Sequence, residues 1–350
     1  MSSSSTSMSI WPGPDSVAKL SRDDAVAYLE RIHLDAAAVW DAQPSLELLR
    51  TLQSAHLVAV PFESTAVHVQ NWHADHAELD LGHGETVPLA DAGFRHLVHL
   101  RRGGYCFLLN GAYPALLRAL GFNVSECLAR VNMIRKDPAT HRVDWEALSH
   151  QVSIVDWQGS GARYLSDVGF GTGTAFPIPM RDGSEVASIP STDVYRLSQH
   201  DSLPHVPTSL LPDQAPTWML SRRVFADDST PTAPKFVYIP QYAFQLLSAS
   251  HRDVRAMNHY QSTCRDATFY NLFVATLLHL NGERTTLSYH EGSVDDTGRR
   301  AAKLTRTRLT SEHRNDEVLE TRYVPTTIAA VREVLEREFG MLFPHDYPGN

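Results

Sequence analysis

Apolar residues recur at spacings of three and four in several stretches of the first 120 residues. This is the spacing of an amphipathic helix, and it predicts helices over residues 21–40, 45–59, 90–100 and 106–120. Pro114 lies inside the last of these, where a proline is expected to kink or restart the helix. Residues 71–86 are polar and rich in histidine and glycine, which indicates a long loop.

The periodicity changes after Gly121. Short stretches rich in Val and Ile predict strands over residues 124–133, 151–157 and 162–169, and Gln158 to Gly161 between the last two is a hairpin signal. Short strands with long connections are expected over residues 172–234, mixed elements after that, and a closing helix over residues 326–339. Helices followed by strands and then by mixed elements favour an α+β protein over a doubly wound parallel sheet.

Composition narrows the function classes. The chain has 350 residues, of which 43% are hydrophobic, and 31 Lys and Arg stand against 40 Asp and Glu, for a net charge of −9. Such a chain lacks the basic footprint of a nucleic-acid binder, so no nucleic-acid partner is expected. No segment has the 18 apolar residues of a membrane span, and three cysteines cannot form a disulfide framework. Residues 1–15 are serine-rich without a signal-peptide pattern, and we expect a disordered lead on a cytoplasmic protein.

The most unusual local feature is the run from Arg101 to Asn110, RRGGYCFLLN. Two glycines before Cys106 allow a tight backbone approach, and a thiol at a helix N-terminus is expected to have a lowered pKa. A small buried hydrophobe is the usual role of a free cysteine and stays open here. His150 opens a predicted strand and Asp167 ends the next, so pairing across the hairpin would place a base beside its orienting carboxylate.

These motifs together resemble those of the arylamine N-acetyltransferases. That family reads Arg-Gly-Gly-aromatic-Cys-x-Glu/Gln-x-Asn where this chain has RGGYCFLLN over residues 102–110. The His150 strand (HQVSIV) and residues 167–171 (DVGFG) match its histidine strand and aspartate strand end. Residues 60–63 (VPFE) and 260–269 (YQSTCRDATF) are similar to its flanking segments. The likeness extends from about residue 22 to the closing part of the chain.

The resemblance implies a fold and a division of the chain. The family has an N-terminal helical bundle, a central β-barrel and a C-terminal α/β lid. Carried onto this sequence, residues 1–15 are a lead, 16–125 a helical domain with the nucleophile, 126–245 a β-barrel domain with His and Asp, and 246–350 the lid.

The resemblance also implies a chemistry. Cys106 becomes the acyl-carrying nucleophile of a thiol-protease-like triad, with His150 as base and Asp167 as orienter. The acyl donor is acetyl-CoA or malonyl-CoA, the acceptor is an arylamine or arylhydrazine, no metal or bound cofactor is needed, and xenobiotic detoxification is the expected role. The residues expected to contact substrate are Tyr105, Gly169, Phe170 and Gly171. A core position at the strand end explains Phe170 equally well.

One position departs from the family pattern. Leu108 stands where the family usually has Glu or Gln, which alters the hydrogen bonding expected around Cys106 but leaves the triad complete. The long segments over residues 71–86 and 172–234 resemble the filamentous-fungal branch, some members of which prefer malonyl-CoA. The choice between the two acyl donors stays open at this point.

Weaker signals have ordinary explanations. A histidine and aspartate cluster suggests a metal site, but its spacing matches no usual zinc pattern and a solvated loop explains it: His73, Asp75, His76, Asp80 and His83. Three arginines near the motif could meet CoA phosphates, although surface charge or a structural pair with Glu63 explains each of them: Arg101, Arg102 and Arg130.

Other functions fit parts of the pattern. An amide synthase of secondary metabolism would use the same triad with a carrier-bound acyl chain. A hydrolytic thiol enzyme such as a peptidase shares Cys, His and Asp but lacks the Arg-Gly-Gly-Tyr context before Cys106. A non-catalytic homologue, suggested by Leu108, would leave a complete triad idle. The acyl donor that the protein requires distinguishes these alternatives.

Overall fold

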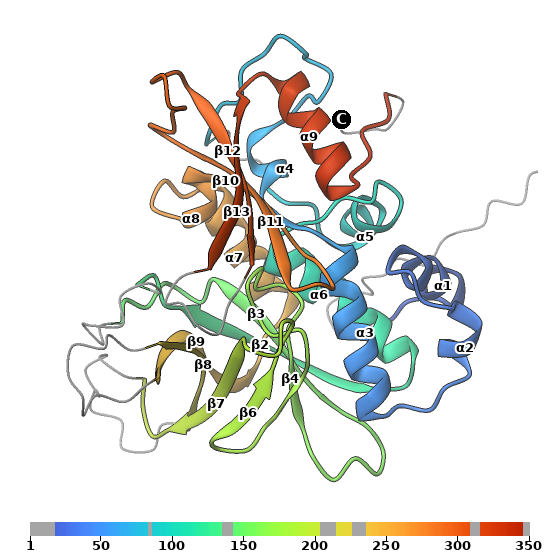
Figure 1. The fold of residues 1–350 in the computed structure, drawn as a ribbon. Coiled ribbons are helices and arrows are strands. Elements are labelled where there is room, and N and C mark those ends of the chain that lie inside the picture. Colours follow the sequence, from blue (N-terminus) through green and yellow to red (C-terminus); the bar gives the residue numbers. More distant parts are fainter. Residues whose placement is uncertain are drawn as a thin grey trace, which may run out of the picture.

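The computed structural model describes residues 18–82, 86–134, 143–203, 215–225, 236–308 and 316–345. Figure 1 shows two sheets, one above the other, with the N-terminal helices along one side. The predicted lead over residues 1–15 and His83 of the predicted loop lie outside the described residues. The order of helices, then a strand-rich middle, then mixed elements confirms the α+β class.

Helices dominate the first part of the described chain: α1 (Arg22–Arg31), α2 (Ala36–Trp40), α3 (Leu46–Ala59), α4 (Thr65–His68), α5 (Ala90–Val98) and α6 (Cys106–Ala119). The single helix predicted over residues 21–40 is wrong, because the chain breaks at His33, whose φ is 61°. Asp35 then starts a new helix by accepting hydrogen bonds from the N–H groups of Ala37 and Ala38, at 3.0 and 3.2 Å.

The middle of the chain forms an eight-stranded antiparallel sheet in the order β5-β4-β3-β2-β9-β8-β7-β6. Its strands are β2 (Asn123–Val131), β3 (His150–Asp156), β4 (Tyr164–Ser166), β5 (Ile178–Pro179), β6 (Ser184–Ala187), β7 (Val194–His200), β8 (Thr217–Phe225) and β9 (Phe236–Ser248). The edge strands β5 and β6 contact each other, so the sheet curls into a nearly closed barrel (Figure 1). Buried residues such as Val152, Leu220 and Phe244 fill its interior.

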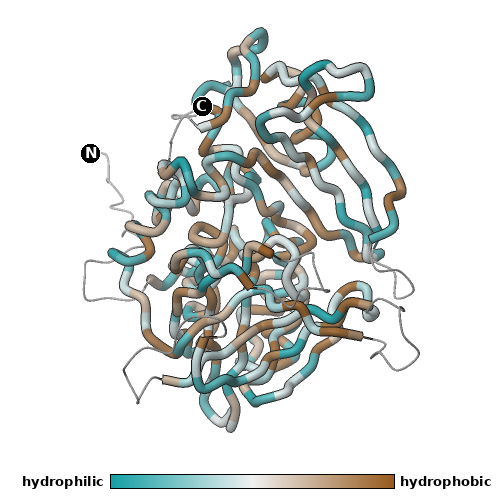
Figure 2. Tube along the Cα trace, turned by 90° about the vertical axis from the view of Figure 1, so that its left-hand side faces the viewer, coloured by the Kyte–Doolittle hydropathy of each residue, from teal (hydrophilic) through white to brown (hydrophobic). Residues whose placement is uncertain are grey.

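The last part of the chain forms a second antiparallel sheet in the order β1-β10-β11-β12-β13. After α7 (His251–Thr263) and α8 (Thr268–Asn271), its strands are β10 (Leu272–Leu278), β11 (Glu283–His290), β12 (Ala301–Arg308) and β13 (Glu317–Pro325). Helix α9 (Ile328–Phe339) packs on this sheet and shares a core with it. Figure 2 shows brown, hydrophobic stretches alternating with teal, hydrophilic stretches along the chain.

The edge strand of the second sheet comes from the N-terminal half of the chain. Strand β1 (Phe62–Glu63) pairs with β10, so that Phe62 lies opposite Thr276. The last sheet therefore includes a segment of the predicted helical domain. The predicted domain limits, 16–125, 126–245 and 246–350, stay a prediction.

Helix α6 runs between the barrel and the N-terminal helices, and most of its residues are buried. It continues through Pro114 without a break. A proline has no N–H to donate to the carbonyl four residues earlier, which here is that of Asn110. The Gln151 side chain donates to that carbonyl instead, at 2.8 Å. This bond ties α6 to strand β3, whose first residue is His150.

Candidate active site

Cys106 is the first residue of α6, and close packing in front of the helix places it there. A Cβ atom on Gly103 would lie 1.8 Å from the Pro61 carbonyl oxygen, so only glycine fits where the motif passes β1. The N–H of Glu63 donates to the carbonyl of Gly104 at 3.1 Å. The Cys106 side chain is buried and donates a weak hydrogen bond from Sγ to the Ser149 carbonyl at 3.5 Å.

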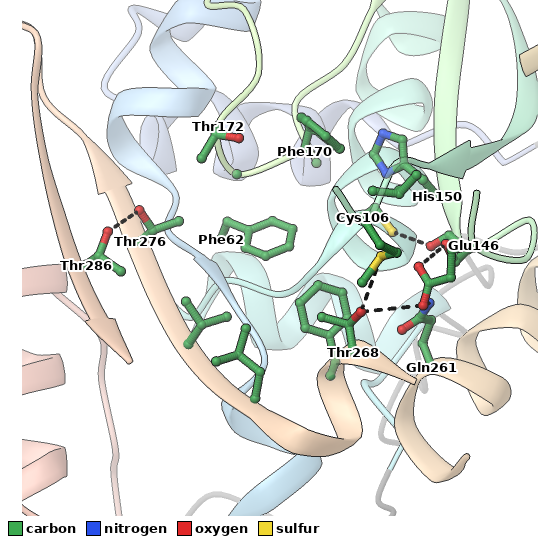
Figure 3. A pocket seen from close by; sticks show the side chains of 18 of the residues that line it. Phe62, Cys106, Glu146, His150, Phe170, Thr172, Gln261, Thr268, Thr276 and Thr286 are labelled. Carbon is green, nitrogen blue, oxygen red and sulfur yellow. Dashed lines mark hydrogen bonds between the residues drawn. The ribbon is translucent and has the colours of Figure 1, made fainter. Parts of the chain in front are cut away.

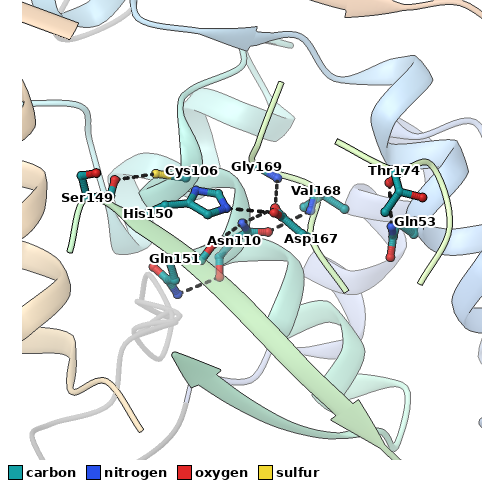
Figure 4. A network of polar contacts seen from close by, with 10 residues as sticks. All are labelled: Gln53, Cys106, Asn110, Ser149, His150, Gln151, Asp167, Val168, Gly169 and Thr174. Carbon is teal, nitrogen blue, oxygen red and sulfur yellow. Dashed lines mark hydrogen bonds and ion pairs between the residues drawn. The ribbon is translucent and has the colours of Figure 1, made fainter. Parts of the chain in front are cut away.

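The predicted histidine and aspartate are in contact. Strands β3 and β4 pair antiparallel, so His150 at the start of β3 lies beside the residues that follow β4. His150 Nε2 lies 2.8 Å from Asp167 Oδ2, and both side chains are buried. Because a carboxylate only accepts hydrogen bonds, Nε2 carries the proton and Nδ1 is left as an acceptor. Figure 4 shows this second ring nitrogen directed toward Cys106.

Asp167 is held by two further donors. Its Oδ1 atom accepts from Asn110 Nδ2 at 2.7 Å and from the Gly169 N–H at 2.8 Å. Burial raises the pKa of Asp167, but the contacts with His150, Asn110 and Gly169 outweigh it and hold the pKa below its usual value. Asn110 lies one turn along α6 from Cys106, so a single helix positions the thiol and orients the carboxylate (Figure 4).

Two aromatic rings enclose the His150 imidazole. The ring centroid of Phe170 lies 5.2 Å from that of His150, and the centroid of Tyr242 lies 4.9 Å from it. The Phe170 and Tyr242 rings also pack against each other, at 4.9 Å. These contacts restrict the imidazole to one orientation between Cys106 and Asp167.

The Cys106 thiol is not acidified by its position at the helix N-terminus. Burial raises its pKa most strongly, and the charges of Asp167 and Glu146 raise it further. Backbone N–H groups of Gln151 and Phe107 act in the opposite direction but do not outweigh burial. The lowered pKa that the sequence led us to expect for the Cys106 thiol is therefore wrong, because desolvation of the thiol outweighs the effect of the helix N-terminus.

Cys106 and His150 open into a pocket of about 200 Å³ between the barrel and the second sheet. Of the residues expected to contact substrate, Gly169, Phe170 and Gly171 line it. Tyr105 is not among the described residues that line this pocket. It is buried behind the wall, where its hydroxyl donates to the side chain of Asn258 at 2.5 Å.

Several lining residues were not singled out in the sequence. Glu146 lies in the pocket wall and accepts hydrogen bonds from Ser149 at 2.6 Å, Gln261 at 3.1 Å and Thr268 at 3.5 Å (Figure 3). Gln261 and Thr268 belong to residues 260–269, whose similarity to a family segment could have indicated that they lie at the site. Glu146 and Arg284, which also lines the pocket, stand in no motif.

Two motif residues have structural roles. Arg102 is buried with its guanidinium over the rings of Phe343, at 3.8 Å, and Trp72, at 5.1 Å, so it is not available to CoA phosphates. Leu108 is also buried, and a Cβ on Gly93 or Gly104 would lie 2.6 Å from its side chain. The position that is usually polar in the family is here part of an apolar cluster.

No group of three or more His, Cys, Asp or Glu side chains within the described residues could hold a metal ion. None of the helices that the structure describes is long and apolar enough to cross a bilayer.

Residues 45–323 match the family model for N-acetyltransferases. The chain belongs to the N-acetyltransferase family. It is 33% identical over 177 residues to the arylamine N-acetyltransferase / N-hydroxyarylamine O-acetyltransferase of Salmonella typhimurium, covering 50% of this chain and 53% of that protein. The chain thus spans about half the length of such bacterial relatives. The N-malonyltransferase FDB2 of Fusarium pseudograminearum is 24% identical over 299 residues, covering 82% and 80% of the two chains.

Solved structures of this N-acetyltransferase family have the same fold. The Salmonella typhimurium arylamine N-acetyltransferase superposes with a TM-score of 0.64 at 23% identity, covering 93% of this chain and 94% of that chain. The Mycobacterium marinum arylamine N-acetyltransferase in complex with CoA gives a TM-score of 0.59 at 23% identity, covering 91% and 92%. These likenesses confirm the predicted architecture.

Proposed function

We propose that this protein is an acyl-CoA:arylamine N-acyltransferase that works through an acyl group bound to Cys106. The observation that carries the proposal is that His150 contacts Asp167 while Cys106 and His150 line an apolar pocket, in a chain of this family. A thioester needs a soft nucleophile, and a thiol beside a histidine supplies one without a metal.

The first half-reaction forms the acyl-enzyme. The proton of the Cys106 thiol passes to His150 Nδ1 as Sγ attacks the thioester carbonyl. The bond between the carbonyl carbon and the CoA sulfur then breaks, and the imidazolium returns the proton to the departing CoA thiolate. Asp167 stabilises the imidazolium while it carries the charge.

The second half-reaction releases the product. The nitrogen of an arylamine or arylhydrazine attacks the acyl carbon, and His150 accepts the proton that this nitrogen loses. The carbon–Sγ bond breaks, the Cys106 thiol is restored with that proton, and the acylated amine leaves. Phe62, Phe170 and Phe269 line the pocket and offer apolar surface to an aromatic ring.

Acetyl-CoA and malonyl-CoA are both proposed as donors. Bacterial relatives are named as arylamine N-acetyltransferases, and a fungal relative with longer coverage is named as an N-malonyltransferase. Detoxification of aromatic amines in the cytoplasm is the role that we propose for this chemistry.

Turnover with a Cys106→Ala variant tests the proposal. Wild-type protein is expected to acylate an arylamine with acetyl-CoA or malonyl-CoA as donor, and the variant is expected to lose this activity while its thermal unfolding stays unchanged. Substitution of the free thiol Cys264, which lies outside the pocket lining, is the matched control. Retained turnover in Cys106→Ala, or acylation only by a carrier-bound donor, would contradict the proposal.

A further inference from the structure

A carboxylate stands in the pocket wall beside the nucleophile. Glu146 and Cys106 both line the pocket, and Figure 3 shows them on the same side of it, away from Thr276 and Thr286. Burial raises the pKa of the Cys106 thiol most strongly, and the charge of Glu146 is one of those that raise it further. An acyl group bound to Sγ is therefore exposed to the negative charge of this carboxylate.

The backbone of Glu146 is fixed against strand β2. Its N–H donates to the carbonyl of Val131 at 2.9 Å, and its own carbonyl accepts a hydrogen bond from Arg130 Nη1 at 3.2 Å. Four residues later the chain enters β3 at His150. These bonds hold Glu146 beside the start of the strand that supplies the base.

The partners of the Glu146 side chain are neutral. Its Oε2 atom accepts from Ser149 Oγ at 2.6 Å, and its Oε1 atom accepts from Gln261 Nε2 at 3.1 Å and from Thr268 Oγ1 at 3.5 Å. These donors orient the carboxylate without cancelling its charge. The Arg130 guanidinium is bonded to the backbone carbonyl, and Arg130 is not among the described residues that line the pocket.

The two proposed acyl donors differ in the charge that they bring to this place. A malonyl group carries a carboxylate two bonds from the acyl carbon, so on Cys106 this carboxylate stays close to Sγ and to the charge of Glu146. Like charges in a partly closed pocket repel each other more strongly than in bulk water. An acetyl group has no charge and meets no such penalty. The phosphates of CoA are common to both donors, so their effect cancels when the donors are compared.

A cation in the pocket lining stands at the other wall. Arg284 pairs with Leu278 in the second sheet, two residues beyond Thr276. Figure 3 shows Thr276 across the ring of Phe62 from Cys106. A carboxylate that is held two bonds from the acyl carbon therefore meets the charge of Glu146 before that of Arg284.

We propose that Glu146 makes this protein select uncharged short acyl groups, so that acetyl-CoA is used in preference to malonyl-CoA. The inference rests on the proposed function and names the class of acyl donor for that same site. Glu146 acts through its charge, which repels an anionic acyl group as the thioester with Cys106 forms. The proposal gives this chain a different donor from the fungal relative that is named as an N-malonyltransferase.

The first experiment compares donors of similar size. Butyryl-CoA and malonyl-CoA have acyl groups of similar length, and only the malonyl group is charged. We measure the rate at which each acylates Cys106, by intact-protein mass spectrometry, in the wild type and in Glu146→Gln. The ratio of the malonyl rate to the butyryl rate is expected to rise about tenfold in Glu146→Gln, because one like charge near the acyl group is removed.

Matched variants separate charge from structure. The amide of Glu146→Gln can donate to Gln261 Oε1, which is buried without a hydrogen-bond partner among the described residues. Glu146→Asp keeps the charge and is expected to keep most of the discrimination. Glu291→Gln removes the same charge from an exposed turn after β11 and is expected to leave the ratio unchanged. An unchanged ratio in Glu146→Gln, or an equal rise in Glu291→Gln, would overturn the inference. Faster acylation of the wild type by malonyl-CoA than by acetyl-CoA would also overturn it.

The second experiment tests the charge of Glu146 without an acyl donor. Iodoacetate and iodoacetamide alkylate a thiol by the same step, in which Sγ bonds to the methylene carbon, iodide leaves and the thiol proton passes to a base. Only iodoacetate is anionic, and a change in the pKa of Cys106 affects both reagents alike. We expect the ratio of the iodoacetate rate to the iodoacetamide rate at Cys106, from peptide mass spectrometry, to rise about tenfold in Glu146→Gln and to stay unchanged in Glu291→Gln.

This second ratio distinguishes the two proposals. If it rises in Glu146→Gln while no CoA ester acylates the wild type, the proposed function fails and the repulsion of anions by Glu146 stands. If CoA esters acylate Cys106 but neither ratio changes in Glu146→Gln, the proposed function stands and this inference is refuted.

Discussion

Asp167 does more at the site than supply a charge. Its Oδ2 atom receives the Nε2–H of His150, while Oδ1 is held by Asn110 and Gly169. The carboxylate therefore fixes which ring nitrogen is free to accept the proton of Cys106. In the mechanism proposed above, Asp167 prepares Cys106 for attack by orienting the imidazole of His150.

An Asp167→Asn variant tests whether Asp167 sets the tautomer of His150. The amide keeps an oxygen for Gly169 and Asn110 but presents an NH₂ group to His150, which favours the wrong imidazole tautomer. We expect the rate of Cys106 acylation by acetyl-CoA to fall by about a hundredfold or more, with little loss of stability. Stopped-flow kinetics measures the acylation rate, and thermal unfolding measures the stability. A rate within threefold of the wild type would mean that another group orients His150.

The residues of the candidate site differ in how well the sequence predicted their place in it. Cys106, His150 and Asp167 stood in motifs with a recognisable order, and the structure brings them together. Asn110 was part of a quoted motif, but its bond to Asp167 depends on the pairing of distant elements. Arg284 is one of 31 cationic residues and has no local pattern, so only the packing of β11 over the pocket reveals it.

At the scale of elements, the site depends on how closely the loop after β4 approaches α6. A Cβ atom on Gly169 would lie 2.8 Å from Cys106 Cα and 2.7 Å from Asn110 Nδ2. Any side chain at this position must push the loop away from the helix. The close approach of this loop to Cys106 and Asn110 therefore requires a glycine at position 169.

Gly169→Ala is expected to separate these two elements. The added methyl displaces Asn110 from Asp167, and overpacking of this kind typically costs about 1–3 kcal/mol of unfolding free energy. We expect that loss in urea denaturation, together with at least a tenfold loss of acylation rate. Gly173→Ala is the control in the same loop, because the atoms nearest to its added Cβ belong to the Phe170 side chain, at 3.2 Å, and not to Cys106 or Asn110. Similar behaviour of the two variants would contradict the account.

Sequence patterns predicted the elements with strong periodicity and missed those without it. Helix α3 follows the expected limits because Ser45 caps it and Pro61 follows it closely. The polar helix α7 was not predicted, since few apolar residues mark its inner face. Pro114 was expected to disturb α6, but the Gln151 side chain satisfies the carbonyl that proline leaves free, which is a tertiary effect.

At the scale of the whole molecule, buried histidines link stability to pH. His56 is buried between α1 and α6, and burial, followed by the charge of Arg31, lowers its pKa to about 3. In the unfolded chain its pKa is about 6.5. Below that pH the unfolded state binds a proton that the folded state does not. Stability therefore falls as the pH falls from about 6.5 toward 3.

The slope of this loss is measurable. His56 contributes about 1.4 kcal/mol per pH unit within that window. We expect urea denaturation at pH 6 and pH 5 to show a smaller difference in His56→Gln than in the wild type. His76→Gln, at an exposed position, is expected to keep the wild-type difference. An unchanged difference in His56→Gln would show that His56 is protonated in the folded protein.

The proposed mechanism requires that Cys106 carries the acyl group. Intact-protein and peptide mass spectrometry after incubation with acetyl-CoA or malonyl-CoA, without an amine, tests it most directly. We expect a mass gain of one acyl group, which maps to the peptide that contains Cys106 and is lost when an arylamine is added. An acyl group on any other residue, or none from either donor, would contradict it.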